Sequence, residues 1–482
     1  MPPAMDPTTG FTLRAGQMKY VSRDARETHA IIEVTAGGTF QEAEAAEVIV
    51  LDCSDSMNLP WTKLAQARKA GAAAIEALRD GVRFGLIAGN HEARMIYPED
   101  ERLVAATRET KDEAKQAVRR LIASGATSMG AWLRLADTLL AAHPDAVRHL
   151  VLLTDGRNLP AYRQDLDDAL TRCRGRFDCH GLGLGDDYDP GELQRVVSAL
   201  RGSAEAVQHG SDLARMAAEL VRRSMSRRVP GVWIRIRTTR VARVSEVRQE
   251  FPAKADLTGL GRRIAPNVMS YSTGAWEQGE TRHFHLRLRL DLAHLPPGED
   301  VLAAQVAVAD AEAGGHGEPV AVAGGHGEPV AVLVHRTDDS ALSSVLDPEV
   351  DHYLRHHELA KATTAGWEAY NEGNGDLAAR QWGRAVALAA GLGDRVQLEA
   401  LGRLVHVVGD PAEGVVRIRP DLQRRDISRS VFASHQPPRP PRAAAPSPSS
   451  EGVSGRICGR GHPSPPDARF CEECGYTWSG SA

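Results

Sequence analysis

Three oxygen-bearing side chains alternate in a short stretch of this chain: Asp52, Ser54 and Ser56. They come directly after the apolar run from Val48 to Leu51, which is typical of a buried parallel strand. A carboxylate with two neutral hydroxyls suits Mg²⁺, and side chains at alternate positions converge if the loop after the strand curls. Three oxygens are too few for an octahedron, so further ligands must come from elsewhere in the chain.

Two later stretches offer such ligands. Residues 125–130 form a small-residue loop before an apolar helix and contain Thr127, and residues 152–156 read as a strand that ends in Asp155. The carboxyl ends of parallel strands form the edge of an open sheet where ligands bind, so we expect both side chains near Asp52. Taken alone, the first motif is more typical of a turn and a helix N-cap than of a metal site, but the two later stretches favour a metal site.

The order Asp-x-Ser-x-Ser, Gly-x-Thr and Thr-Asp-Gly resembles the metal-ion-dependent adhesion site of von Willebrand factor type A (vWA) domains, over about residues 45–225. The resemblance implies Mg²⁺ or Mn²⁺, with an open coordination position that accepts an Asp or Glu of a partner protein. Asp55 departs from the family pattern, which often has Gly there. The resemblance implies that Ser54, Ser56 and Thr127 contact the metal directly. It implies that Asp52 and Asp155 act largely through water.

A second constellation lies near the end of the chain. Cys458, His462, Cys471 and Cys474 have the spacing C-x3-H…C-x2-C, which predicts a closed tetrahedral Zn²⁺ site with a structural role. So short a segment should fold only with its metal. It resembles a bacterial zinc ribbon, in which the first pair is commonly Cys-x2-Cys, so His462 is the departure. We expect it to contact protein rather than nucleic acid, because few aromatic side chains are available for stacking.

Two other polar clusters have plainer interpretations. Asp186, Asp187 and Asp189 resemble a second metal site, but they are also typical of a solvated loop that starts a helix. His283 and His285 share one face of a predicted strand. We expect that face to be the solvent-facing side of a half-buried sheet.

The elements that must position these residues follow a simple pattern. Strands alternate with helices over residues 41–228, which predicts an α/β fold with a doubly wound, mainly parallel sheet of the Rossmann-like vWA type. The segment 93–97 is expected to pair antiparallel with the strand before it. Residues 229–345 show period-two strands, typical of an antiparallel β-sandwich. The strands predicted in residues 8–40 are expected to belong to that sandwich, so that the α/β domain is inserted in it or followed by it.

The rest of the chain is predicted to be less regular. Residues 346–410 read as a helical hairpin, 411–455 as a disordered Pro-rich linker, and 456–482 as the zinc ribbon. The decapeptide AGGHGEPVAV occurs twice in tandem, at residues 313–322 and 323–332, and one copy is expected to lengthen a surface loop.

Composition excludes several classes of function. The chain has 482 residues and a net charge of −5, so nothing marks it as a nucleic-acid binder. No apolar run is long enough for a membrane helix, and the start lacks the pattern of a signal peptide. The six cysteines show no disulfide framework, which favours a cytoplasmic protein. The excess of Arg over Lys and the many alanines suggest a GC-rich genome. The family resemblance implies a bacterial protein of the actinobacterial type.

These observations lead to a ranked set of functions. We expect a cytoplasmic, non-catalytic scaffold or adaptor that binds a partner protein, such as a signalling protein, through the metal site, with the partner's Asp or Glu completing the metal shell. The alternative is an accessory subunit that presents clients to a separate AAA+ ATPase, since the chain lacks a phosphate-binding Gly-x4-Gly-Lys loop of its own. A metal-dependent hydrolase is the weakest alternative, because no His or Glu general base stands beside the metal motif.

Overall fold

The computed structural model of the protein describes residues 10–37, 43–185, 188–207, 210–229, 231–309, 328–440, 456–457 and 463–464. The chain divides into two compact units, Met1–Pro438 and Arg439–Ala482. In the second unit the described strands β23 (Arg456–Ile457) and β24 (Pro463–Ser464) pair antiparallel. The four expected zinc ligands lie outside the described residues, as do Asp186 and Asp187, so the zinc ribbon stays a prediction.

A seven-stranded sheet forms the centre of the α/β domain, with the order β10-β9-β8-β4-β5-β6 and β7 paired with β5. The expected α/β alternation is confirmed, and β6 is antiparallel to β5 as predicted. β7 is antiparallel as well, and the other neighbours are parallel. The strands are β4 (Ala45–Asp52), β5 (Arg83–Gly89), β6 (Ala93–Tyr97), β7 (Val104–Ala105), β8 (Val147–Thr154), β9 (Asp178–Leu184) and β10 (Ala204–Val207).

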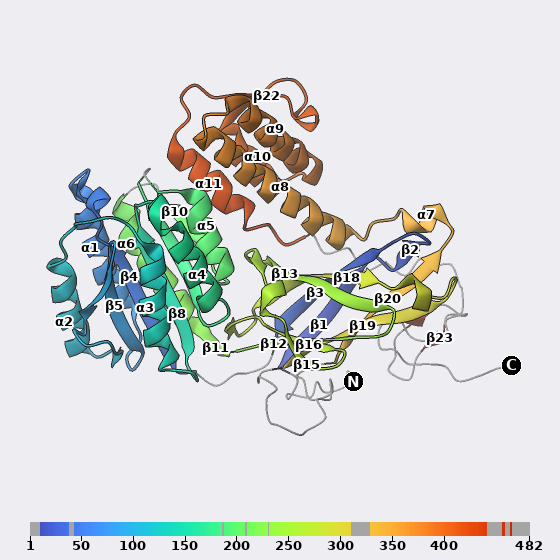
Figure 1. Cartoon of the computed structure of the whole chain (residues 1–482), viewed down its shortest axis with the longest axis horizontal. Helices are drawn as coiled ribbons and strands as arrows, with labels where there is room; N and C mark the ends of the chain where they lie inside the picture. Colours follow the sequence, from blue (N-terminus) through green and yellow to red (C-terminus); the bar gives the residue numbers. More distant parts are fainter. Residues whose placement is uncertain are drawn as a thin grey trace. The chain divides into compact units, whose positions relative to one another are not determined.

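Helices cover both faces of this sheet, as Figure 1 shows. Every residue of the aliphatic strand β4 is buried, because successive side chains enter opposite layers. Val48 and Val50 belong to one core, and Ile49 and Leu51 to the other. The first core is closed by α3 (Met129–Ala141), α4 (Arg163–Cys173) and α5 (Pro190–Ala199), and the second by α1 (Thr62–Ala77), α2 (Arg108–Arg119) and α6 (Gly210–Ser226). The 3-10 turns η1 (Asp55–Asn58) and η2 (Pro160–Tyr162) lie in the loops.

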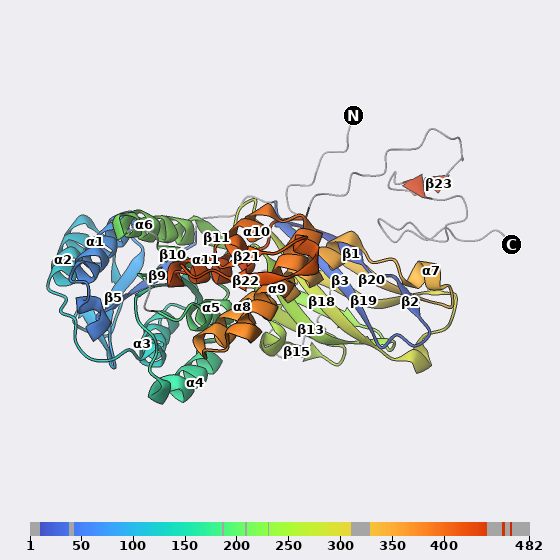
Figure 2. The ribbon, with the colours of Figure 1, turned by 90° about the horizontal axis from the view of Figure 1, so that it is seen from above.

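Two mainly antiparallel sheets form a β domain that contains strands from both sides of the α/β domain in the sequence. β3 pairs with β18, so that Ile32 stands opposite Phe284. One sheet has the order β1-β3-β18-β13-β14 and the other β15-β16-β12-β19-β20-β2, where β2 and β20 run parallel. Ile32 and Phe284 of the first sheet share a core with Ile234 and Val306 of the second. Figure 2 shows these strands from above.

The bounds of the β-domain elements are as follows. The first sheet contains β1 (Phe11–Gln17), β3 (Glu27–Ala36), β13 (Ala242–Phe251), β14 (Ala255–Asp256) and β18 (Thr281–Leu290). The second contains β2 (Tyr20–Ser22), β12 (Trp233–Thr238), β15 (Arg262–Ala265), β16 (Val268–Ser272), β19 (Asp300–Ala309) and β20 (Val330–Thr337). A separate pair is β11 (Arg227–Val229) with β17 (Trp276–Glu277), and short helices are η3 (Thr258–Leu260), η4 (Leu292–His294) and α7 (Ser340–Ser343).

His283 and His285 on the polar face of β18 are buried, and the prediction that they face solvent is wrong. Helix α8 (Pro348–Asn371) packs against this sheet, and the Tyr353 hydroxyl forms a hydrogen bond with His283 Nδ1 at 2.8 Å. His285 Nε2 lies 2.9 Å from a ring nitrogen of His29 on the neighbouring strand. The alternation of the strand indicates a polar face, but it does not reveal that a helix covers it.

Replacement of Tyr353 by phenylalanine is expected to lower the free energy of unfolding by about 1 kcal/mol, because it removes a buried hydrogen bond from the His283 ring. Chemical denaturation of the wild type and the variant measures the difference. Tyr370→Phe is the matched control, since Tyr370 lies on the same helix with its side chain partly exposed. Equal effects of the two substitutions would contradict the assignment of this hydrogen bond.

The helical region continues beyond the hairpin that was expected to end at residue 410. Its further elements are α9 (Gly375–Leu392), α10 (Arg395–Gly402), β21 (Val405–Val407), η6 (Pro411–Glu413), β22 (Val416–Ile418) and α11 (Arg424–Ser434). The prediction of a disordered linker from residue 411 is therefore wrong for the described residues up to 440. Ile427, Val431 and Phe432 on α11 are buried, and the Phe432 ring stacks on Tyr188 with centroids 6.2 Å apart. Burial of this apolar face against the α/β domain stabilises the helix.

A second contact joins the helical region to the α/β domain. Asp189 is the N-cap of α5, which confirms the predicted helix start, and its Oδ1 accepts hydrogen bonds from the main-chain N–H groups of Gly191 and Glu192 at 2.9 and 3.2 Å. The same oxygen accepts a hydrogen bond from Trp367 Nε1 of α8 at 3.0 Å.

Among the helices that the structure describes, none combines the length and apolar character needed to cross a membrane.

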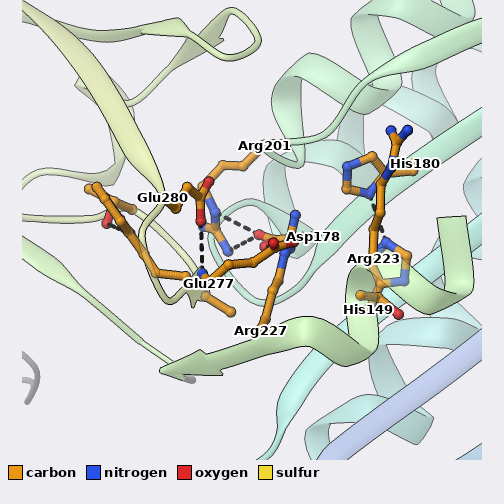
Figure 3. A network of polar contacts seen from close by, with 12 residues as sticks. His149, Asp178, His180, Arg201, Arg223, Arg227, Glu277 and Glu280 are labelled. Carbon is orange, nitrogen blue, oxygen red and sulfur yellow. Dashed lines mark hydrogen bonds and ion pairs between the residues drawn. The ribbon is translucent and has the colours of Figure 1, made fainter. Parts of the chain in front are cut away.

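Buried charges join the α/β domain to the strand that leads into the β domain. Asp178, at the start of β9, accepts a hydrogen bond from Arg201 Nε at 2.9 Å and forms an ion pair with Arg227 on β11 (Figure 3). Burial alone would raise the pKa of Asp178, but the two guanidinium groups outweigh burial and hold that pKa below its ordinary value. The carboxylate is therefore a fixed negative charge between two cations.

Candidate metal site

The sheet topology brings the predicted oxygen ligands to one edge. β4 and β8 are parallel neighbours with Leu51 opposite Leu153, so Asp52 and Asp155 leave the sheet side by side. The loop that contains residue 127 is held against the loop after β4 by two main-chain hydrogen bonds of 2.7 Å, from Asp55 N to Gly125 O and from Ser124 N to Cys53 O. The position of these residues thus follows from strand order and from loop pairing.

A continuous chain of hydrogen bonds joins the two carboxylates. The main-chain N–H and the hydroxyl of Ser54 both donate to Asp52 Oδ1, at 2.8 and 2.6 Å. The hydroxyls of Ser54 and Ser56 are 2.9 Å apart, and the Ser56 hydroxyl donates to Asp155 Oδ1 at 2.7 Å. Four of the five predicted residues are therefore linked by one chain of hydrogen bonds.

Thr127 is buried beside the same carboxylates. A Cβ atom added at Gly156 would lie only 2.5 Å from Thr127 Oγ1 and 3.2 Å from Asp52 Oδ2, so this glycine leaves the space in which the threonine hydroxyl approaches the carboxylate. Thr154, which we did not predict, donates from its hydroxyl to Asp52 Oδ2 at 2.6 Å. The structure thus brings all five predicted residues together and adds one that orients Asp52.

The second residue that the sequence analysis missed is Lys63. Its Nζ donates to Asp155 Oδ2 at 2.7 Å, and both side chains are almost completely buried. Lys63 lies in the first turn of α1, where the helix dipole disfavours a cation. A lysine at such a position is a sequence signal that a carboxylate lies nearby, although it does not indicate which one.

The electrostatics of the cluster favour a bound cation. Burial, and then repulsion from Asp155, raises the pKa of Asp52 to about 6. Lys63 supplies one positive charge for two buried carboxylates, so the ionised cluster lacks positive charge. A divalent cation would supply the missing charge.

The donor set fits Mg²⁺ or Mn²⁺. Two carboxylates and three hydroxyls, linked by short contacts, are the oxygen ligands that a hard cation takes. The part of the chain that the structure describes contains no group of three or more His, Cys, Asp or Glu side chains placed to hold a metal. This cluster has only two such side chains, Asp52 and Asp155, and its remaining donors are hydroxyls.

The affinity for Mg²⁺ is expected to fall about tenfold for each pH unit below the pKa of Asp52, because the metal must displace that proton. The pKa of about 6 places this loss within the range accessible to the folded protein. The stability of the metal-free protein changes with pH in the opposite direction from the Mg²⁺ affinity. Because the pKa of Asp52 is higher in the folded state than in the unfolded state, the free energy of unfolding decreases as pH rises from about 4 to about 6. Calorimetric titrations from about pH 5 to about pH 7 test this, and a constant affinity would contradict it.

Comparison with known proteins agrees with the fold of the α/β domain. The family model of the von Willebrand factor type A domain matches residues 46–206. The solved structure of a von Willebrand factor type A protein from Catenulispora acidiphila is 31% identical, with a TM-score of 0.79, over 90% of this chain and 99% of that chain. The chain therefore belongs to the von Willebrand factor type A family.

Two further relatives are more distant. The ArnB paralog VWA2 from Sulfolobus acidocaldarius is 12% identical, with a TM-score of 0.50, over 89% of this chain and 98% of that chain, and this likeness shows the fold alone. The uncharacterized protein sll0103 from Synechocystis sp. is 26% identical over 275 residues, which is 55% of this chain. The match spans 62% of that curated relative's own length.

Proposed function

We propose that this protein is a non-catalytic scaffold that binds a partner protein through a Mg²⁺ or Mn²⁺ ion held by its vWA domain. The observation that supports the proposal is the buried oxygen cluster, in which Asp52, Ser54, Ser56 and Asp155 are joined by hydrogen bonds of 2.6 to 2.9 Å beside Thr127. Membership of the vWA family supports a role in protein interaction.

The residues have separate roles in this proposal. The hydroxyls of Ser54, Ser56 and Thr127 would hold the ion without neutralising it, and Asp52 and Asp155 would orient those hydroxyls and the surrounding water. When bound, the metal would supply a cation with a coordination position that accepts a partner's Asp or Glu. The expected cytoplasmic location and the structural zinc ribbon stay predictions beside it.

Affinity capture with the full chain as bait tests the proposal. A partner is expected to be retained by the wild type with Mg²⁺ and lost with EDTA or with Thr127→Ala. Thr138→Ala is the matched control, because Thr138 is exposed on α3 and bonds only within its own helix, to Arg134 O. If the same proteins appear with wild type, variant and EDTA alike, the metal site does not mediate binding and the proposal fails.

A further inference from the structure

Large apolar side chains are exposed on the loops around the oxygen cluster. Leu59 is 77% exposed, Trp61 is 78% exposed, Ile122 is 70% exposed and Leu159 is 43% exposed. Single exposed apolar residues are normal on a protein surface. Four on adjoining loops at one functional edge are unusual, and we refer to these four residues as the apolar rim.

Hydrogen bonds place each member of the rim beside the cluster. Leu59 and Trp61 lie on the short segment between Ser56 and Lys63, both of which contact Asp155. The loop of Ile122 is held to the same segment, since Asn58 Nδ2 donates to Ala123 O at 3.4 Å and Ser124 N donates to Cys53 O at 2.7 Å.

Leu159 approaches from the third loop. Its main-chain N–H donates to Thr127 O at 3.3 Å, so it follows the loop that contributes the threonine hydroxyl. The segments after β4 and β8 and the loop before α3 thus each bring an apolar side chain to the surface next to the oxygen cluster. None of these four side chains is needed to hold the oxygen cluster together.

We propose that the apolar rim is the second half of the partner-binding surface, and that the partner is a protein segment in which an Asp or Glu is flanked by a large apolar or aromatic side chain. The inference rests on the proposed function, because the metal supplies the point at which the acidic residue binds. The rim adds selectivity among acidic segments, which a metal ion alone cannot provide.

Charge complementarity supports an acidic segment as the occupant. Within the cluster, the carboxylates of Asp52 and Asp155, the ammonium of Lys63 and one divalent cation together leave one net positive charge. An incoming carboxylate would neutralise it. Lys63 therefore makes the loaded site more attractive to an acid than two carboxylates and a divalent cation alone would be.

The types of side chain in the rim support a protein partner. Exposed tryptophan is the residue most typical of binding hot spots, and its burial at the centre of an interface commonly dominates affinity. In an extended segment, residues rise about 3.3 Å each, so side chains within three positions of the acid stay within about 10 Å of it. A segment with this composition would fill both parts of the surface.

Selection from a library of short displayed peptides with a fixed Asp and random flanks tests the inference. The full chain is the target in Mg²⁺, and bound peptides are eluted with EDTA. We expect Trp, Phe or Leu to be enriched near the Asp. A synthetic peptide of the enriched sequence should bind the Leu59→Ser/Trp61→Ser variant about thirtyfold more weakly than the wild type.

Controls separate the rim from the metal. The double variant should keep the Mg²⁺ affinity of the wild type, and Val396→Ser, at an exposed apolar position on α10, should keep the peptide affinity. EDTA-eluted peptides with no preference beside the Asp would overturn the role of the rim and leave the proposed function standing. The absence of any EDTA-eluted peptide would overturn both. Mg²⁺-dependent self-association that the double variant abolishes would show that a second copy covers the rim, against the peptide partner.

Discussion

Replacement of Lys63 by methionine is expected to lower the stability of the metal-free protein by about 3 kcal/mol, because it leaves the buried Asp155 carboxylate without its cation. Methionine keeps most of the volume of the lysine side chain, so packing changes little. With the ammonium absent, the two carboxylates would bind Mg²⁺ about tenfold more tightly, since a nearby positive charge no longer opposes the ion. Mg²⁺ should therefore restore most of the lost stability.

Thermal and chemical unfolding of the variant in EDTA and in Mg²⁺ measure both effects. The matched control is Lys69→Met, because Lys69 lies on the same helix with an exposed side chain. If the variant is destabilised equally in EDTA and in Mg²⁺, Lys63 has only a packing role and does not affect the metal site.

Replacement of Asp178 by alanine is expected to lower the free energy of unfolding by about 3–5 kcal/mol, because it leaves two buried guanidinium groups without their shared carboxylate. Arg201 and Arg227 would then face each other across the junction shown in Figure 3. Since the pKa of Asp178 is lowered by folding, its contribution is present above the unfolded pKa of about 4 and is lost as pH falls through the folded value.

Guanidinium-induced unfolding at neutral and acidic pH tests this expectation. Asp145→Ala is the control, since Asp145 is exposed just before β8, at the end of that strand opposite to the oxygen cluster. The difference between wild type and Asp178→Ala should shrink as pH falls, because the wild-type carboxylate becomes protonated. A loss of less than about 1 kcal/mol at neutral pH would contradict the role of this ion network.

The proximity of the five oxygen-bearing side chains could be predicted because their position depends on local rules. A strand that ends in Asp52 and another that ends beside Asp155 must meet at one edge if both belong to a parallel sheet. The alternation of Val48 to Leu51 likewise determines which side chains enter which helical layer. These inferences need only the pattern within each segment and the sheet topology.

The sequence does not show which carboxylate Lys63 contacts, because its contact with Asp155 joins residues 92 positions apart. The burial of His283 depends on Tyr353, which lies 70 positions later on a helix with its own amphipathic pattern. α11 was concealed by the Pro-rich composition that follows it, although Ile427 and Val431 have helical spacing. In each case tertiary packing decides what local composition leaves open.

Calorimetric titration of Mg²⁺ into the EDTA-treated full chain is the most direct test of the central claim, that the oxygen cluster is a metal site. The wild type should show saturable binding near neutral pH, and Asp52→Asn should show none while it stays folded. Ser54→Ala should weaken binding and keep it measurable, because other oxygen donors remain. Equal binding by the wild type and Asp52→Asn, or no binding by either, would contradict the claim.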